Sequence, residues 1–140
     1  MVVGGTDREQ ITDLLIRYAT GIDTKDWPLF RTCFTDDVRA DYGDIGVWTD
    51  VDGLTEFMTT SHETMSSTKH MMSNFVIDVD GDAASATSYV HVVLVLTREP
   101  QTWIDAVGHY VDTLVRASDG WKIRERTFSM TRQLASDQLA

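Results

Sequence analysis

Apolar residues recur at helical spacing near the start of the chain. Thr6 and Glu9 have the spacing of a capping box, which is a helix-start pattern. The apolar stripe behind this box predicts a helix from about residue 7 to residue 21 or 22. The stripe consists of Ile11, Leu14, Leu15, Tyr18 and Ile22.

Two further helices are expected before the long strands begin. Asp26 is a plausible N-cap for a short second helix. Asp52 is the expected N-cap of a third helix over about residues 53–65, whose apolar side is expected to be buried. His62 lies on this third helix, and we expect its side chain to face solvent.

From residue 67 onward the pattern changes to alternating and β-branched residues separated by short polar turns. The aspartate–glycine sequence within residues 80–82 is typical of a tight hairpin turn, and a second one lies within residues 118–120. These turns predict four long strands in successive hairpins, with one shorter strand among the helices. The expected strands are residues 38–42, 67–78, 83–96, 102–117 and 121–132, followed by a loosely held tail, 133–140.

The strand of residues 67–78 carries the histidine around which we organise the functional interpretation. Regular alternation places His70, Met72, Asn74 and Val76 on one face of this strand. The opposite face is mostly apolar, so the face with His70 is the one suited to lining a pocket. A single histidine near the start of a strand is, however, more often a structural residue than a catalyst.

Three helices followed by long strands in hairpins predict an α+β fold rather than an alternating α/β fold. A long antiparallel sheet with helices on one face curls, which leaves a cone open at one end. We therefore expect a single domain over residues 1–140: a cone-shaped, barrel-like curved antiparallel sheet with three N-terminal helices that enclose a pocket. The loop of residues 43–52 carries Trp48 and is interpreted as a flap over this pocket.

The charge balance narrows the classes of partner. The 140 residues include 22 acidic and 12 basic side chains, for a net charge of −10. This balance argues against nucleic acid and anionic membrane surfaces as partners, because both select basic faces. Neither a signal peptide nor an apolar run of membrane-spanning length is visible, so the expected compartment is the cytoplasm.

The sequence offers no pattern typical of a metal site. Cys33 is the one cysteine, which excludes an internal disulfide and a multi-cysteine metal site. The four histidines lie on separate expected elements, and none is paired with a carboxylate at helical metal-binding spacing. We therefore expect neither a metal nor a cofactor.

Short motifs are spread over residues 6–132. They are Tyr18-Ala19, Asp23-Thr24-Lys25-Asp26-Trp27, Phe34-Thr35-Asp36-Asp37-Val38, Asp41-Tyr42, Lys69-His70-Met71, Gly108-His109-Tyr110 and Gly120-Trp121-Lys122-Ile123. Together they resemble the SnoaL-like branch of the nuclear transport factor 2-like superfamily, which has a cone-shaped α+β fold. Within this branch the chain most resembles scytalone dehydratase and bile-acid 7α-dehydratase, with hexachlorocyclohexane dehydrochlorinase a step away.

The resemblance implies a set of site residues. These enzymes share an aspartate just after the first helix and a histidine that opens a strand, and Asp23 and His70 match both. Tyr42 matches a pocket tyrosine of the scytalone enzyme, and Tyr18 matches a tyrosine of the bile-acid enzyme. Arg126 matches an arginine of the dehydrochlorinase.

The chain also departs from these enzymes. Ile22 stands where the scytalone enzyme has a tyrosine, and His91 lies only near the place of its second histidine. Catalytic roles are expected for the four residues His70, Asp23, Tyr42 and Tyr18. Substrate contacts are expected for Arg126, His91 and Trp48.

The residues themselves leave alternatives open. A carboxylate at a helix C-terminus faces the negative end of the helix dipole, at a cost of about 0.3–1 kcal/mol. Either a histidine partner or the loop leading to Asp26 would offset this cost for Asp23. Tyr18 lies in an apolar stripe and is equally suited to packing in the core. Arg126 stands among other basic residues of its strand, which favours a surface position.

An aspartate–histidine pair in a water-poor cone suits removal of a proton next to a carbonyl group. Asp23 would fix the tautomer of His70, whose other nitrogen is then a general base near neutral pH. Loss of a β-hydroxyl group would follow, with Tyr42 and Tyr18 hydrogen-bonded to the oxygen on which negative charge develops.

The sequence therefore predicts a cofactor-free, dehydratase-type lyase that acts on a hydrophobic, cyclic hydroxy-carbonyl compound. The alternatives are an isomerase or a dehydrohalogenase that uses the same pair, and a small-molecule-binding domain without chemistry. Because the outer faces of such sheets often pair, we expect a homo-oligomer. The resemblance to the dehydratases favours a trimer, with a dimer as the alternative.

Overall fold

The structure is a computed structural model that describes residues 5–98 and 100–139, so residues 1–4, 99 and 140 of the expected domain lie outside it. Three helices lie in its first half: α1 (Asp7–Asp23), α2 (Trp27–Arg31) and α3 (Val51–His62). The strands are β1 (Phe34–Asp41), β2 (Val47–Trp48), β3 (Met65–Asp80), β4 (Ala83–Leu96), β5 (Trp103–Ala117) and β6 (Gly120–Ala135). Two short 3-10 helices complete the chain, η1 (Gly43–Ile45) and η2 (Ser136–Leu139).

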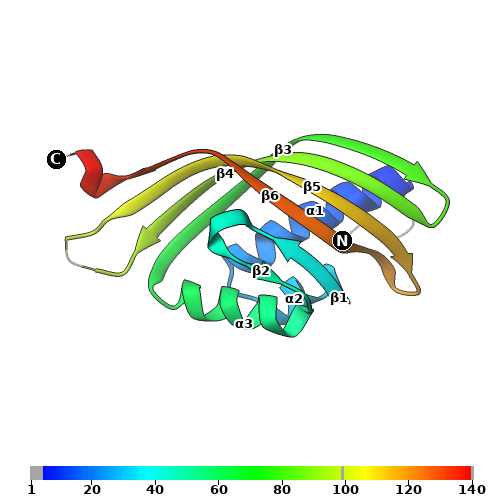
Figure 1. The fold of residues 1–140 in the computed structure, drawn as a ribbon, viewed down its shortest axis with the longest axis horizontal. Helices are drawn as coiled ribbons and strands as arrows, with labels where there is room; N and C mark the ends of the chain where they lie inside the picture. The colour runs from blue at the N-terminus through cyan, green and yellow to red at the C-terminus, as the bar shows by residue number, and fades with distance from the viewer. Residues whose placement is uncertain (1–4, 99, 140) are drawn as a thin grey trace.

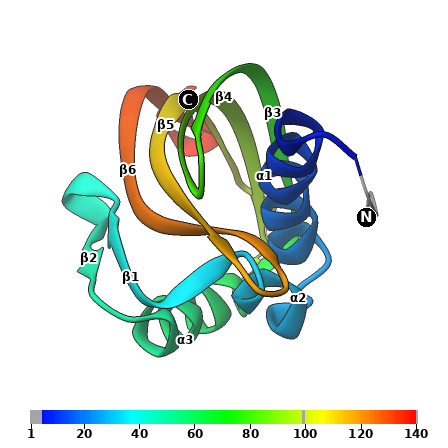
Figure 2. The same cartoon turned by 90° about the vertical axis from the view of Figure 1, so that its right-hand side faces the viewer.

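One curved sheet contains all these strands, in the order β2-β1-β6-β5-β4-β3. Figures 1 and 2 show the long strands curling together, with α1 beside β3 and with α3 on the side of β1. The expected α+β class and the curved sheet with three helices are confirmed. The sheet is mixed, however, because β1 pairs in parallel with β6. No hairpin joins these two strands, so nothing in the local sequence forces them to run antiparallel.

The helix starts follow from side-chain capping. Thr6 and Glu9 form the predicted capping box of α1, and the Asp26 side chain caps α2. The third helix begins earlier than predicted, because Asp50 and not Asp52 is its N-cap: the Asp50 carboxylate accepts from the Gly53 amide at 2.7 Å. This helix also ends earlier, at residue 62.

The expectation that His62 faces solvent is wrong, since only 5% of its surface is exposed. Leu54, Met58 and His62 follow one another at intervals of four residues, so all three lie on the same side of α3. Leu54 and Met58 are buried in the core, and His62 is therefore turned inward with them.

A bulge in β3 interrupts the alternation on which the predicted polar face depended. Asn74 has φ 53°, and the pairing of β3 with β4 shifts by one residue there. Before the bulge His70 and Met72 face the inside; after it Ile77 is buried while Val76 is exposed. The prediction that Asn74 and Val76 share the face of His70 is therefore wrong.

A second bulge lies in β6 and reverses the expectation for Arg126. Ile123 and Glu125 pair with adjacent residues of β5, which leaves Arg124 as the extra residue. From that point the facing of side chains is inverted. Arg126 is consequently turned inward and only 1% exposed, so its interpretation as a surface arginine is wrong.

The outer face of the long strands carries exposed apolar side chains in the middle of β3, β4 and β5. Such a face suits contact with a second copy of the chain, and the expected homo-oligomer remains a prediction. None of the helices that the structure describes is long and apolar enough to cross a membrane. The exposed apolar residues are Met71, Val76, Tyr89 and Val111.

Candidate active site

A cavity of about 200 Å³ lies inside the curve of the sheet, against α1 and α3. Its wall is mainly apolar, with side chains from β3, β4, β5 and β6 as well as from the two helices. Apolar walls with a few converging polar groups are typical of small-molecule sites. Five polar rings reach this cavity: Tyr18, Tyr42, His62, His70 and Tyr110.

The C-terminal turn of α1 places Asp23 beside β3. Lys25 follows the helix with φ 54°, a left-handed conformation, and its amide donates to the carbonyl of Ile22. The Lys25 ammonium group then donates to the carbonyl of Met65 at the start of β3, at 2.8 Å. This contact ties the end of α1 to β3 and holds the Asp23 carboxylate next to the strand.

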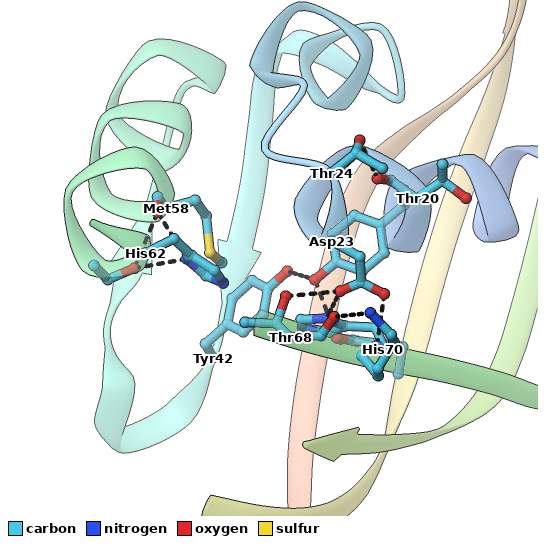
Figure 3. Close-up of polar contacts among 12 residues, drawn as sticks. Thr20, Asp23, Thr24, Tyr42, Met58, His62, Thr68 and His70 are labelled. Carbon is cyan, nitrogen blue, oxygen red and sulfur yellow. Dashed lines mark hydrogen bonds and ion pairs between the residues drawn. The ribbon is translucent and has the colours of Figure 1, made fainter. Parts of the chain in front are cut away.

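Asp23 accepts three hydrogen bonds from β3 (Figure 3). His70 donates twice, through Nδ1 at 2.7 Å and through its backbone amide at 2.8 Å, and the Thr68 hydroxyl donates at 2.9 Å. Burial alone would raise the pKa of the Asp23 carboxyl, but these donors hold it below its ordinary value. Asp23 is therefore an ionised acceptor at neutral pH.

This arrangement fixes the proton of the neutral imidazole on Nδ1, because an ionised carboxylate can only accept. The Nε2 atom of His70 then carries a lone pair, and no described residue donates a hydrogen bond to it. The His70 side chain is 8% exposed and lines the cavity. Asp23 and His70 thus form the contact expected from the sequence, and the free nitrogen belongs to a cavity-lining ring.

Three tyrosine hydroxyls form a chain on another wall of the cavity. The Tyr18 hydroxyl is 2.9 Å from that of Tyr42 and 3.0 Å from that of Tyr110. Burial raises the pKa of all three phenols, so they remain protonated. Three O–H groups share only two internal hydrogen bonds, so one O–H remains to donate to a ligand oxygen whichever way the chain is oriented.

Arg126 lies behind this tyrosine chain rather than at the cavity wall. Its guanidinium group donates to both oxygens of Asp112, at 2.8 and 2.9 Å, and both side chains are fully buried. The same group lies over the faces of Tyr18 and Tyr110, 4.1 and 3.8 Å from the ring centroids. Burial would lower the pKa of Arg126, but Asp112 keeps it raised, and the positive charge supports the two rings.

The structure does not bring the other two expected substrate contacts to the cavity. His91 lies on the outer face of β4, where its ring is 2.9 Å from Asp105 and 44% exposed. Trp48 belongs to β2, which pairs with β1, and its ring packs against Tyr42 and Phe57. Trp48 therefore supports the wall from behind. The segment of the expected flap, residues 43–52, contains η1 and β2, and its Ile45 does line the cavity.

Two of the polar rings at the cavity were missed in the sequence, although each carried a signal. His62 continues the apolar stripe of α3 at a spacing of four residues from Met58. Tyr110 shares the alternation of Ala106, which also lines the cavity. Within residues 5–98 and 100–139, no three His, Cys, Asp or Glu side chains are grouped as metal ligands.

Comparison with known proteins assigns the chain to a family. The model of the SnoaL-like domain matches residues 5–127. This chain belongs to the SnoaL-like family. The uncharacterized protein Rv2910c of Mycobacterium tuberculosis (strain ATCC 25618 / H37Rv) is 30% identical over 125 residues, which span 86% of this chain and 83% of Rv2910c.

Solved structures agree with this assignment and vary in their assigned activity. A Novosphingobium aromaticivorans protein, provisionally assigned as an aromatic ring hydroxylase, is 29% identical with a TM-score of 0.85, over 94% of both chains. Another protein of that organism, provisionally assigned as a scytalone dehydratase, is 23% identical with a TM-score of 0.82, over 91% of this chain and 86% of its own.

The hexachlorocyclohexane dehydrochlorinase LinA (Type2) is 20% identical, with a TM-score of 0.82, over 91% of this chain and 87% of its own. At 23% and 20% sequence identity, the similarity to these last two structures shows a shared fold. The fold is thus shared by proteins assigned as dehydratases, dehydrochlorinases and others without an assigned function. The activity of this SnoaL-like chain has to be argued from its own site.

Proposed function

We propose that this SnoaL-like protein is a cofactor-free lyase that removes water from a hydrophobic, cyclic hydroxy-carbonyl compound. The observation that carries the proposal is the arrangement of His70: its Nδ1 donates to the ionised Asp23, and its Nε2 has no hydrogen-bond partner among the described residues, while the ring lines an apolar cavity. A histidine held in this way has its free nitrogen available to accept a proton from a bound substrate, which is the role of a general base.

The reaction follows from the two polar walls of the cavity. His70 Nε2 takes a proton from the carbon next to the carbonyl group, and the electron pair of that C–H bond forms the new carbon–carbon double bond. The bond from the β-carbon to the hydroxyl oxygen breaks, and that oxygen leaves as water after taking the proton back from His70. Asp23 stabilises the imidazolium while it exists.

Negative charge develops on the carbonyl oxygen during proton removal. The spare O–H of the Tyr42–Tyr18–Tyr110 chain is the donor available to this oxygen. The guanidinium group of Arg126 is stacked behind two of the rings. Its positive charge stabilises the partial negative charge that a tyrosine oxygen gains when its proton is shared with the carbonyl oxygen. Arg126 is thus a positioning residue in this proposal, without a contact to the substrate.

The test uses 3-hydroxy-1-tetralone, a bicyclic hydroxy-ketone that yields 1-naphthol when it loses water and enolises. The wild type should form 1-naphthol, and His70→Gln and Asp23→Asn should each lower the rate by about 10²–10⁴-fold. Asp78→Asn is the matched control, because Asp78 is an exposed carboxylate on the same strand. The proposal fails if the wild type forms 1-naphthol no faster than buffer alone, or if His70→Gln retains the wild-type rate.

Product analysis separates the alternatives. Return of the proton to a different carbon, without loss of water, would make the same pair an isomerase. Loss of chloride from the matching 3-chloro-1-tetralone, with no loss of water from the hydroxy compound, would make it a dehydrohalogenase. Binding of either compound without any product would leave a binding domain.

A further inference from the structure

His62 is a second imidazole at the same cavity, and the reaction proposed above does not use it. Its Nδ1 lies 2.8 Å from the carbonyl of Met58 and 3.1 Å from the Ser61 hydroxyl. A carbonyl oxygen only accepts, so Nδ1 carries the proton and donates. Burial lowers the pKa of the His62 ring, which keeps the imidazole neutral at physiological pH.

The other nitrogen of His62 is therefore a buried acceptor. Its Nε2 has no hydrogen-bond partner among the residues that the structure describes. A buried polar atom without a partner costs about 1–3 kcal/mol, so such an atom at a cavity points to a group that arrives with the ligand. Figure 3 shows the His62 ring extending from α3 toward Tyr42, and its centroid is 6.4 Å from that of the His70 ring.

We propose that His62 Nε2 is a specificity site that accepts a hydrogen bond from a hydroxyl group of the substrate. Met58 also lines this part of the cavity, and its flexible thioether can move aside to let the hydroxyl reach the nitrogen. The inference rests on the proposed function only for the identity of that hydroxyl. The hydroxyl bound by His62 differs from the leaving hydroxyl. A leaving oxygen must gain a proton, whereas a hydrogen-bond acceptor such as His62 Nε2 draws the proton of the hydroxyl away from its oxygen.

The substrate class becomes narrower as a result. The compound would be a ring ketone with a leaving hydroxyl near His70 and a second, retained hydroxyl that reaches His62. A phenolic hydroxyl fits the second position well, because it is a strong donor on a flat apolar ring. An ether or a bare hydrocarbon at that position would leave Nε2 without a partner.

The test compares two probes that differ by one donor, 2-naphthol and 2-methoxynaphthalene. Their dissociation constants are measured by NMR titration with the wild type, His62→Phe and the control His91→Phe, which makes the same change on the outer face. The wild type and His91→Phe should bind 2-naphthol about 3- to 10-fold more tightly than the methyl ether. His62→Phe should lose most of this preference.

A measurement on the wild type keeps the inference testable if His62→Phe does not fold. Long-range nitrogen–proton NMR should find His62 protonated on Nδ1, with an Nε2 resonance that shifts on addition of 2-naphthol and not of the methyl ether. A proton on His62 Nε2 overturns the inference. So does a preference for 2-naphthol in His62→Phe that is as large as the preference of the wild type. None of these readouts needs turnover, so failure of the proposed function is recorded separately by His70→Gln with 3-hydroxy-1-tetralone.

Discussion

Replacing Asp23 with asparagine should move the proton of His70 from one ring nitrogen to the other. The carboxylate accepts from His70 Nδ1, the His70 amide and the Thr68 hydroxyl. An asparagine has only one accepting oxygen, which the backbone amide would take, and its NH₂ group would face Nδ1. Two donors cannot share a hydrogen bond, so Nδ1 would become the acceptor and Nε2 would carry the proton.

The same contacts set the stability cost. A hydrogen bond to a charged group contributes about 1.5–3 kcal/mol and a neutral one about 0.5–1.5 kcal/mol, so each of the three bonds loses about 1 kcal/mol. Removal of a negative charge from the C-terminus of α1 returns about 0.3–1 kcal/mol. The free energy of unfolding of Asp23→Asn should therefore be lower by about 2 kcal/mol.

Two assays check this reasoning. Long-range nitrogen–proton NMR reads the tautomer of His70 at a pH where the ring is neutral, and guanidinium unfolding reads the stability. Asp78→Asn serves as the control and should change neither quantity. If His70 in Asp23→Asn keeps its proton on Nδ1, or if the variant is as stable as the wild type, the account of the Asp23 contacts is refuted.

Three further predictions concern charge and assembly. Asp112→Asn leaves Arg126 buried without its partner and should lower the free energy of unfolding by about 3–5 kcal/mol, whereas Asp112→Leu combined with Arg126→Met should be neutral or stabilising in the same unfolding assay. Because the pKa of Asp23 is depressed in the folded state, its contribution is present above the unfolded value of about 3.9 and is lost as the pH falls through the lower folded value. The stability difference between the wild type and Asp23→Asn should therefore narrow below about pH 4, and a constant difference would contradict the assigned pKa direction. Light scattering should find more than one copy per particle, and Val76→Asp on the outer face should shift the protein toward monomer; a monomeric wild type would refute the expected assembly.

The helices and hairpins could be predicted from the sequence because their signals are local. Capping side chains, tight turns and apolar spacing lie within a few residues of one another, and the Asp23–His70 contact followed from the family motifs. The facing of Asn74 and Arg126 could not be predicted, since a bulge inverts the facing of the side chains that follow it up to the next irregularity. His62 was misplaced because a histidine was taken as polar, although its spacing assigned it to the buried side of α3.

The central claim is that His70, oriented by Asp23, removes a proton next to a carbonyl group inside the cavity. The direct measurement is hydrogen–deuterium exchange at the carbon next to the carbonyl of 1-tetralone, which has no leaving group, followed by NMR in D₂O. The account predicts that the wild type accelerates this exchange and that His70→Gln lowers the acceleration by about 10²–10⁴-fold, with Asp78→Asn unchanged. Exchange at the buffer rate with the wild type, or at the wild-type rate with His70→Gln, would contradict it.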